Sequence, residues 1–453
     1  MSGTARTTAV AGRGATVDTW IPSRYNFHAT LEGGARIVSN LFTGQTETID
    51  EATWDTYLAR GAQYAVPAAA VPESAQDLFD QGFLVSQSID ELERIRVYFQ
   101  EVRYSTTGLR VLIAPTLACN LRCSYCFERG VWGSPAMRRM PLATADAVCA
   151  FVEEAAAGKE EVFVNWFGGE PLLRMDTIGL ISERLLRALG GSDVRYSAEI
   201  TTNGVLLTRQ VVRELCGWNV RQCQLTVDVP GSKKLDARGR PVLNRQLDRA
   251  AEAAADLRIK LRVNISGDNE ADFDGLYAAL RARGLHKALD RIHLALVLPT
   301  ECGGDDCARL SLDDPGSYQV FKREREKLRS MGFPLSEPVP TGSKPCGATC
   351  VDQHLIDPQG FLYKCLNDLG IVDRAYASVI PGRPVQPKNL LPWLTYDWFA
   401  HEECRACPLL PRCAGGCPHR RMRRYVNDCC LYHVREWEEW PEVLRGQAAA
   451  RKP

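Results

Sequence analysis

The sequence has no excess of charge of either sign. Lys plus Arg and Asp plus Glu both number 55 among its 453 residues. A neutral chain offers no overall field for nucleic acid or for an anionic membrane surface. No run approaches the roughly 20 apolar residues that span a bilayer, and the N-terminus lacks an apolar signal core. We therefore expect a cytoplasmic protein with no nucleic acid and no membrane among its partners.

Cysteine, in contrast, is plentiful, with 17 residues. In a long chain without an export signal, many thiols indicate metal ligands rather than disulfides. Three of them form a Cys-x3-Cys-x2-Cys run, directly after the apolar residues 111–114, at Cys119, Cys123 and Cys126. Thiolates hold iron–sulfur clusters, and three thiolates leave one iron of a cubane open to a small molecule. On these residues alone, a zinc knuckle or three unrelated thiols remain alternatives.

Six apolar runs alternate with helical stretches between residues 110 and 299. The runs lie near 110–116, 161–167, 195–201, 221–228, 259–266 and 290–298. The helical stretches lie near 142–157, 175–189, 208–216, 243–257, 270–283 and after the sixth run. This alternation predicts an α/β fold in which helices cover a parallel sheet. Six units are too few for an eight-fold barrel, so we predict an open (β/α)6 partial barrel with its site at the carboxyl ends of the strands.

Polar residues follow the predicted strands, beginning with Gly168-Gly169-Glu170-Pro171 after the second. Singly, each could be a strand-end group satisfied by backbone. Together with the cysteine loop they resemble radical S-adenosylmethionine enzymes. The resemblance implies that an open iron binds S-adenosylmethionine, whose reductive cleavage yields a 5′-deoxyadenosyl radical. It also implies these cofactor-binding residues: Tyr125, Gly168, Gly169, Glu170, Pro171, Thr202, Asn203, Asp228, Arg262 and Asn264. Asp228 is followed by Val229-Pro230 where the family usually has Gly-Pro.

A second cysteine pattern fills the C-terminal part of the chain. It runs Cys346-x3-Cys350-x9-Gly360-x4-Cys365, then Cys404-x2-Cys407-x5-Cys413-x3-Cys417, and ends at Cys429-Cys430. Two structural zinc sites are the physical alternative. The pattern resembles the SPASM extension, which implies two auxiliary [4Fe–4S] clusters and three clusters in all. By position, cluster I would use Cys346, Cys350, Cys365 and Cys417. Cluster II would use Cys404, Cys407, Cys413 and, of the adjacent pair, Cys430.

For the remaining cysteines the sequence allows less specific predictions. We expect Cys149, Cys216 and Cys223 to be small buried hydrophobic residues. Cys302 and Cys307 flank a Gly-Gly-Asp-Asp segment beyond the sixth strand. They are either free thiols of a loop or groups that contact the substrate or take part in redox chemistry.

The N-terminal part reads as a small separate module. We expect disorder over 1–19. A hairpin over Asn26–Leu41 and a third strand at Gln45–Ile49 should follow, and then a helix from Asp50 to Arg60. After a linker over Val66–Pro72, two helices near Glu73–Gln81 and Ile89–Val102 should flank the short apolar run Phe83–Val85. This order resembles the winged-helix module that binds leader peptides, with Trp54 and Leu58 holding the peptide's side chains. A capping domain is the alternative. The predicted domains are 20–104, the barrel at 105–300, a bridge at 301–345 and the SPASM domain at 346–453.

The resemblance implies a maturase that installs a thioether or carbon–carbon crosslink in a ribosomal precursor peptide. A flavodoxin- or ferredoxin-type protein would donate the electrons. One alternative is an anaerobic sulfatase-maturase-like enzyme that makes formylglycine. Its aspartate base would follow Cys365 directly, whereas Leu366 stands there and Asp368 would be a displaced substitute. The other alternative is an iron–sulfur electron-transfer or sensor protein without radical chemistry.

Overall fold

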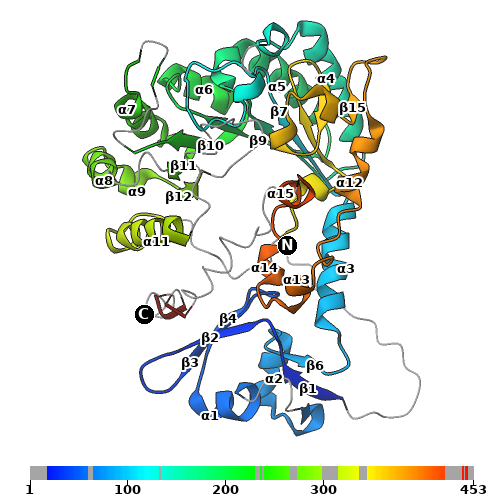
Figure 1. Ribbon diagram of the computed structural model, residues 1–453, viewed down its shortest axis with the longest axis vertical. Coiled ribbons are helices and arrows are strands. Elements are labelled where there is room, and N and C mark those ends of the chain that lie inside the picture. The colour runs from blue at the N-terminus through cyan, green and yellow to red at the C-terminus, as the bar shows by residue number, and fades with distance from the viewer. Residues whose placement is uncertain are drawn as a thin grey trace.

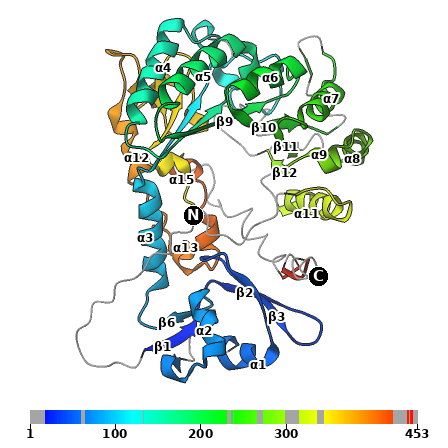
Figure 2. The ribbon, with the colours of Figure 1, turned by 180° about the vertical axis from the view of Figure 1, so that it is seen from behind.

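The computed structural model describes residues 18–59, 65–131, 134–229, 235–236, 239–265, 273–297, 315–335, 344–423, 441–442 and 444–446. The N-terminal module lies at one end of the molecule and the large α/β domain at the other (Figure 1). The short helices of the C-terminal cysteine segment lie between them, as the reverse view also shows (Figure 2). Among the residues described, no helix has the length and apolarity to cross a membrane.

The α/β domain is built on parallel strands that neighbour one another in chain order. They are β7 (Gly108–Ile113), β8 (Glu161–Trp166), β9 (Arg195–Thr202), β10 (Val220–Val227), β11 (Arg258–Ile265) and β12 (Arg291–Leu296). All of the predicted barrel strands are thereby confirmed, and β12 is the edge of the sheet among the strands that the structure describes. Their shared direction brings the loops after β7, β8, β9, β10 and β11 to one end of the sheet.

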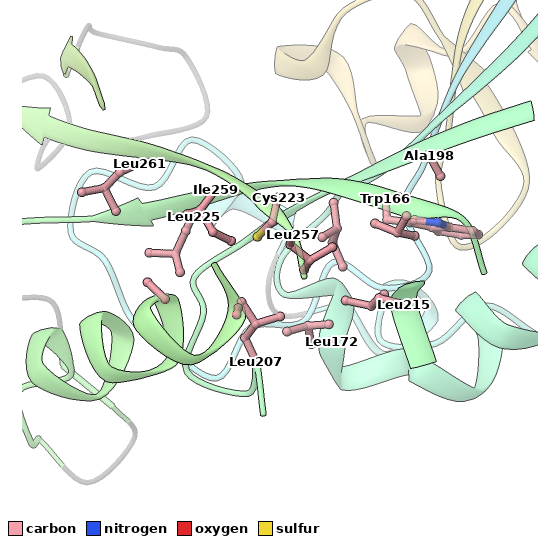
Figure 3. Packing of buried hydrophobic residues seen from close by; sticks show 14 of the residues in the cluster. Trp166, Leu172, Ala198, Leu207, Leu215, Cys223, Leu225, Leu257, Ile259 and Leu261 are labelled. Carbon is pink, nitrogen blue, oxygen red and sulfur yellow. The ribbon is translucent and has the colours of Figure 1, made fainter. Parts of the chain in front are cut away.

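Helices cover one face of this sheet. They are α4 (Leu142–Ala155), α5 (Met175–Leu189), α6 (Arg209–Gly217), α7 (Leu243–Ala253), α8 (Phe273–Ala282), α9 (Leu285–Ala288) and α11 (Pro315–Ser330). Alternate strand residues are buried against them, and Figure 3 shows Leu207 and Leu215 packed below the strand that carries Cys223. Cys223 and Cys149 are 0% and 1% exposed, which confirms them as core residues, whereas Cys216 is half-buried.

The sheet continues beyond β7 into the C-terminal segment, which the sequence did not reveal. β13 (Gln353–Ile356) pairs parallel to β7, and β14 (Phe361–Tyr363) and β15 (Ala377–Ser378) add antiparallel strands. These strands have 4, 3 and 2 residues, too few to display an alternating pattern. The cysteine-rich segment is therefore joined to the barrel by backbone hydrogen bonds along one whole strand.

The N-terminal module contains the predicted meander. β2 (Asn26–Thr30) and β3 (Arg36–Asn40) form the expected hairpin, and β4 (Thr46–Ile49) is the expected third strand. Asp50 caps the next helix, since its Oδ1 accepts from the Thr53 N–H at 2.9 Å. That helix is α1 (Glu51–Thr53) continued by a π-helix over Trp54–Leu58. α2 (Glu73–Asp80), β6 (Leu84–Ser86) and α3 (Glu91–Tyr104) complete the predicted order.

Two details of the module differ from the prediction. A first strand, β1 (Thr19–Pro22), pairs with β6 and with β5 (Val66–Pro67), so the supposed linker over Val66–Pro72 is partly strand. Both strands are short and gain their hydrogen bonds only from distant segments, which a local pattern cannot show. Thr19 is therefore ordered, while residues 1–17 of the predicted disordered leader lie outside the described residues.

The module has one hydrophobic core of its own and shares another. Trp54 and Leu58, 9% and 5% exposed, pack with Trp20, Val38 and Leu84 in its own core. The prediction that they hold a peptide's side chains is therefore wrong. The second core joins β2, β3 and α3 to the C-terminal cysteine segment; its members include Phe27, Ile37, Phe99, Trp398, Phe399 and Leu410.

Candidate functional site

The loop after β7 carries the three closely spaced cysteines. Burial, followed by the charge of Glu170, raises the pKa of Cys119 to about 12, and burial raises that of Cys126 well above its usual range. The charge of the Cys123 thiol also raises the pKa of both residues. Thiols in this environment become thiolates when a cation binds them. The donor set thus fits a cluster that takes one thiolate per iron.

A single metal ion fits these residues less well. In the part of the chain that the structure describes, no three His, Cys, Asp or Glu side chains gather tightly enough to hold one ion. A tetrahedral zinc site would need such a group. The zinc knuckle that the cysteine spacing left open therefore has no support from the geometry.

The two glycines after β8 let this loop approach the cysteine loop. Gly168 has φ +112°, and a Cβ on it would lie 2.1 Å from the Thr116 carbonyl oxygen. A Cβ on Gly169 would lie 2.4 Å from the Ala118 oxygen. The Gly169 and Glu170 N–H groups donate to these same two carbonyls at 3.1 and 2.9 Å. Only glycine permits this backbone-on-backbone contact.

Glu170 joins the loop after β8 to the end of β9. Its side chain is 0% exposed. Oε1 accepts from the Leu172 N–H at 3.1 Å and the Thr202 hydroxyl at 2.7 Å, and Oε2 accepts from the Asn203 N–H at 2.8 Å. A buried carboxylate needs such donors because it has lost its hydration. Glu170 and the Thr202 hydroxyl thus face protein groups, while Pro171 opens a 3-10 helix (Pro171–Arg174) that Glu170 caps.

Asn203 connects this network to the cysteine loop. Its Nδ2 donates to Asn120 Oδ1 at 2.7 Å and lies 3.8 Å from Cys119 Sγ. Its Oδ1 accepts from the Val205 N–H at 3.0 Å. The ends of β8 and β9 and the cysteine loop therefore form one hydrogen-bonded unit.

Tyr125, between the second and third cysteines, reaches the opposite strands. Its hydroxyl donates to Asp228 Oδ1 after β10, and Asn264 Nδ2 on β11 donates to it at 3.3 Å. Arg262 Nε donates to Asn264 Oδ1 at 3.0 Å. Burial, followed by the Asp228 charge, raises the pKa of Tyr125 well above its usual range. The structure thereby brings all of the sequence-predicted cofactor residues to the end of the sheet that carries the cysteine loop.

Two buried polar residues near this end were not anticipated. Gln246 on α7 is 0% exposed and donates Nε2 to the carbonyls of Asn203 and Thr226 at 2.5 and 3.2 Å. It interrupts the apolar stripe of its helix, which was the signal available in the sequence. Glu128 follows the last loop cysteine, and burial raises its pKa to about 8.

The candidate ligands of auxiliary cluster I converge from three places in the C-terminal segment. Although Cys346 is exposed at the surface, the surrounding protein partly desolvates its sulfur and, with the Cys417 and Cys350 thiols, raises its pKa to about 11. Burial also raises the pKa of Cys365, with contributions from Cys346 and Cys417. The buried Lys364 ammonium donates to the carbonyls of Cys350 and Gln353, both at 2.5 Å, and so fixes the backbone beside two candidate ligands.

The candidate ligands of auxiliary cluster II lie on short helices. Cys404 is on α13 (Glu402–Ala406) and Cys413 ends α14 (Leu410–Cys413), with Cys407 between them. Arg421 on α15 (Pro418–Arg423) donates Nη2 to Cys404 Sγ at 3.1 Å. Cys429 and Cys430, like Cys302 and Cys307, lie outside the described residues.

Asp368 is held by cations rather than open to a substrate. Its side chain is 4% exposed, and its Oδ1 lies 2.8 Å from Arg374 Nη1 and 3.4 Å from His419 Nε2. The hydrogen bond and charge of His419, followed by those of Arg374, outweigh burial and keep the pKa of Asp368 below its usual range. The carboxylate joins the turn after Cys365 to the helix after Cys417.

Comparisons with known proteins agree with this geometry. Residues 113–280 match the family model described as the radical SAM superfamily, SAM being S-adenosylmethionine. Over 166 residues the chain is 24% identical to the radical SAM cyclopropyl synthase TigE of Paramaledivibacter caminithermalis, covering 33% of this chain and 34% of TigE. Over 185 residues it is 29% identical to a GTP 3′,8-cyclase of Rhizobium etli, covering 40% of this chain and 50% of the cyclase. The chain thus spans a third to a half of the length of these relatives.

A solved structure shares the fold more widely. Native anSMEcpe, solved with bound AdoMet and the Cp18Cys peptide, superposes with a TM-score of 0.56 at 19% identity. The superposition covers 76% of this chain and 100% of anSMEcpe. At this identity the likeness establishes only a common fold.

Proposed function

Because residues 113–280 match the radical SAM superfamily model, we propose that this chain is a radical SAM maturase that crosslinks a ribosomally made precursor peptide. The observation that carries the proposal is the cysteine loop at the strand ends together with a cysteine-rich C-terminal segment. In that segment Cys346, Cys365 and Cys417 act electrostatically on one another, and Cys404 and Cys407 pack in one hydrophobic cluster. When bound, S-adenosylmethionine and the cluster of the cysteine loop supply a 5′-deoxyadenosyl radical that removes a substrate hydrogen.

The protein's own residues bind and orient the cofactor. Cys119, Cys123 and Cys126 hold the cluster, and the backbone of Gly168 and Gly169 lies against the same loop. Glu170 and Asn203 keep the ends of β8 and β9 in register with that loop. Tyr125 and Asn264 are joined by a hydrogen bond and form the other side of the cofactor site. Such buried networks hold a site rigid, which the control of a reactive radical requires.

The face of the sheet opposite the helices is the proposed place of the substrate. It carries half-buried polar side chains, among them Asn165, Glu199 and Lys260. Asn165 Nδ2 donates to Glu199 Oε1 at 2.6 Å, and Lys260 Nζ lies 3.8 Å from Glu199 Oε2. Polar groups of this kind suit the main chain and polar side chains of a peptide. They favour an enzyme over an electron-transfer or sensor protein, which needs no substrate face.

The N-terminal module is the proposed docking site for the leader part of the precursor. β3 is paired with β2 on one side and with β4 on the other, so an incoming strand can add only at an outer edge, that of β2 or that of β4. On β4, the pairing of Asn40 with Gln45 directs the N–H of Thr48 away from β3. Thr48 and Glu47 are exposed there. We favour this edge for β-strand addition of the leader.

A proline pair tests the docking edge. Thr48→Pro removes an outward N–H without disturbing the hydrogen bonds to β3. It should weaken binding of a labelled leader peptide to the full-length protein at least tenfold. His28→Pro makes the same change at the outer edge of β2 and should leave the affinity unchanged. Equal affinity of the Thr48 variant and the wild type would show that the leader peptide does not dock at this edge.

Three cubane clusters should give roughly twelve irons per chain after anaerobic reconstitution. Cys430 is the proposed last ligand of cluster II. Cys429→Ala should then retain full iron content, whereas Cys430→Ala should lose about a third of it. The reverse pattern of iron loss would exchange these two roles and leave the other ligands unaffected.

Formylglycine formation of the sulfatase-maturase type is the second candidate. The displaced base that this reaction would need does not follow from the geometry. Asp368 would have to leave its contacts with Arg374 and His419 before it could take a substrate proton. The crosslinking maturase therefore fits the described residues better.

Anaerobic turnover with the short peptide encoded nearest to this chain tests the proposal. The reconstituted protein, S-adenosylmethionine and dithionite should yield 5′-deoxyadenosine and a peptide lighter by two hydrogen atoms. A peptide of unchanged mass, with deoxyadenosine formed, would refute the maturase role for that peptide. Conversion of a cysteine to formylglycine would instead favour the second candidate.

A further inference from the structure

Tyr25 lies where the N-terminal module meets the C-terminal cysteine segment. It precedes β2, and its side chain is 0% exposed. Among the described residues its hydroxyl has no hydrogen-bond partner. A buried donor that stays unsatisfied costs about 1–3 kcal/mol, so a hydroxyl in this position needs an acceptor that the surrounding side chains do not supply.

The side chains packed around Tyr25 are mostly apolar, and the Arg24 guanidinium carbon lies 5.4 Å from its ring centroid. Its hydrophobic cluster includes Phe27, Phe99 and Leu409, together with the buried Cys404, and Cys407 packs against the same cluster. Cys407 is also close enough to act electrostatically on Tyr25. Burial raises the pKa of Tyr25 to about 12, and Cys407, the one contributing group outside the N-terminal module, raises this pKa further.

The neighbouring backbone holds this arrangement in place. Arg24 Nη2 donates to the carbonyl of Arg405, which lies between Cys404 and Cys407 in the chain, at 2.9 Å. The Tyr25 carbonyl accepts from the Leu41 N–H at 3.0 Å, which fixes Tyr25 to the meander. On the other side, Arg421 already donates to Cys404 Sγ. Cys404 Sγ thus already accepts one hydrogen bond from a local donor, and the Arg24 contact holds the N-terminal module against the backbone between Cys404 and Cys407.

We propose that the Tyr25 hydroxyl donates a hydrogen bond to the sulfur shell of auxiliary cluster II, so that the N-terminal module tunes the reduction potential of that cluster. The inference rests on the auxiliary cluster proposed above. A hydrogen bond to a ligand sulfur stabilises the more negative, reduced cluster and raises its potential. Tyr25 is then a positioning residue, which acts through the cluster and touches no substrate.

The test is a potentiometric titration of the anaerobically reconstituted full-length protein, followed by electron paramagnetic resonance. Tyr25→Phe removes only the hydroxyl oxygen and keeps the apolar packing. At a fixed ambient potential, the ratio of reduced to oxidised cluster II should fall about tenfold, which is about 59 mV for a one-electron couple. Iron content and the potentials of the other two clusters should not change.

Two further proteins make the test decisive. Tyr196→Phe is the matched control, because the Tyr196 hydroxyl is also buried but lies at the end of β9 remote from the site. It should alter no potential. A fluorinated tyrosine at position 25 is a stronger donor and should raise the potential of cluster II.

The outcomes separate this inference from the cluster assignment. A cluster II potential that is identical in the wild type, the Tyr25→Phe variant and the fluorotyrosine protein, at full iron content, would overturn the role of Tyr25. A wild-type protein with only about eight irons, equal to two clusters, would instead overturn the assignment of two auxiliary clusters, whatever the variants do.

Discussion

The barrel site and the C-terminal cysteine segment differ in what holds them. At the barrel site, side chains at the ends of β8 and β9 form a buried network around Glu170, and the glycine motif is bonded to the cysteine loop through backbone. The C-terminal cysteines lie on turns and on helices of 4 to 6 residues. Short helices have little stability alone. We therefore expect the barrel site to keep its shape without its cluster, and the C-terminal segment to depend on packing and on the proposed auxiliary clusters.

Removal of iron should have the largest effect and should affect the two regions unequally. Metal binding contributes about 10–16 kcal/mol to folding in small zinc-binding peptides, so the segment over 346–417 should lose order when its clusters are stripped. Hydrogen exchange of the reconstituted and the chelator-treated protein measures this. Amides of 402–417 should lose most of their protection, while those of β8 to β11 keep theirs. Equal loss of amide protection in both regions would contradict the difference proposed between them.

The second effect concerns packing between the N-terminal module and the cysteine segment. Phe99 on α3 is 0% exposed, and its ring centroid lies 5.3 Å from that of Trp398. Phe99→Ala should lower the free energy of unfolding by about 3–5 kcal/mol. Val97→Ala on the same helix is the control, since Val97 is 56% exposed, and should change it by less than about 0.5 kcal/mol. Thermal unfolding with iron analysis reads out both variants.

This shared core also limits deletion experiments. Removing residues 1–104 would expose Trp398, Phe399 and Leu410 to water. Loss of crosslinking after such a deletion would therefore report damage to the cysteine segment as much as loss of a docking module. The single substitutions at Thr48 and Tyr25 avoid this difficulty.

A smaller effect is expected at the barrel network. Glu170→Gln keeps the shape of the side chain but turns an amide NH₂ toward the Thr202 hydroxyl or the Asn203 N–H. Leaving one of these donors unsatisfied should cost about 1–3 kcal/mol and should weaken S-adenosylmethionine binding. Urea unfolding and equilibrium binding measure the two consequences. Glu154→Gln on the exposed face of α4 should change neither value.

The part of this architecture that follows a regular pattern was predictable from the sequence. The alternation of apolar runs and helices predicted β7 to β12, and the cysteine and glycine motifs fall at their carboxyl ends. The hairpin and the Asp50 cap were also found because they depend on neighbouring residues. These features are local, or repeat with the period of a strand or a helix.

Features that depend on contacts between distant segments were not predictable. β13 to β15 are strands only because β7 offers an edge. The inward direction of the Glu170 carboxylate follows from donors on β9, and Trp54 is buried because β3 packs on it. The core that joins Phe99 to Trp398 links residues almost 300 positions apart, and no sequence motif marks it.

The most direct test of the central claim is a triple substitution of Cys119, Cys123 and Cys126 by alanine. Because the barrel network does not depend on these thiols, the variant should fold, lose about four of roughly twelve irons and form no 5′-deoxyadenosine with dithionite and S-adenosylmethionine. A variant that loses Cys404, Cys407 and Cys413 should still cleave S-adenosylmethionine. Continued deoxyadenosine formation by the first variant, or full iron content in it, would contradict the assignment of radical chemistry to the barrel site.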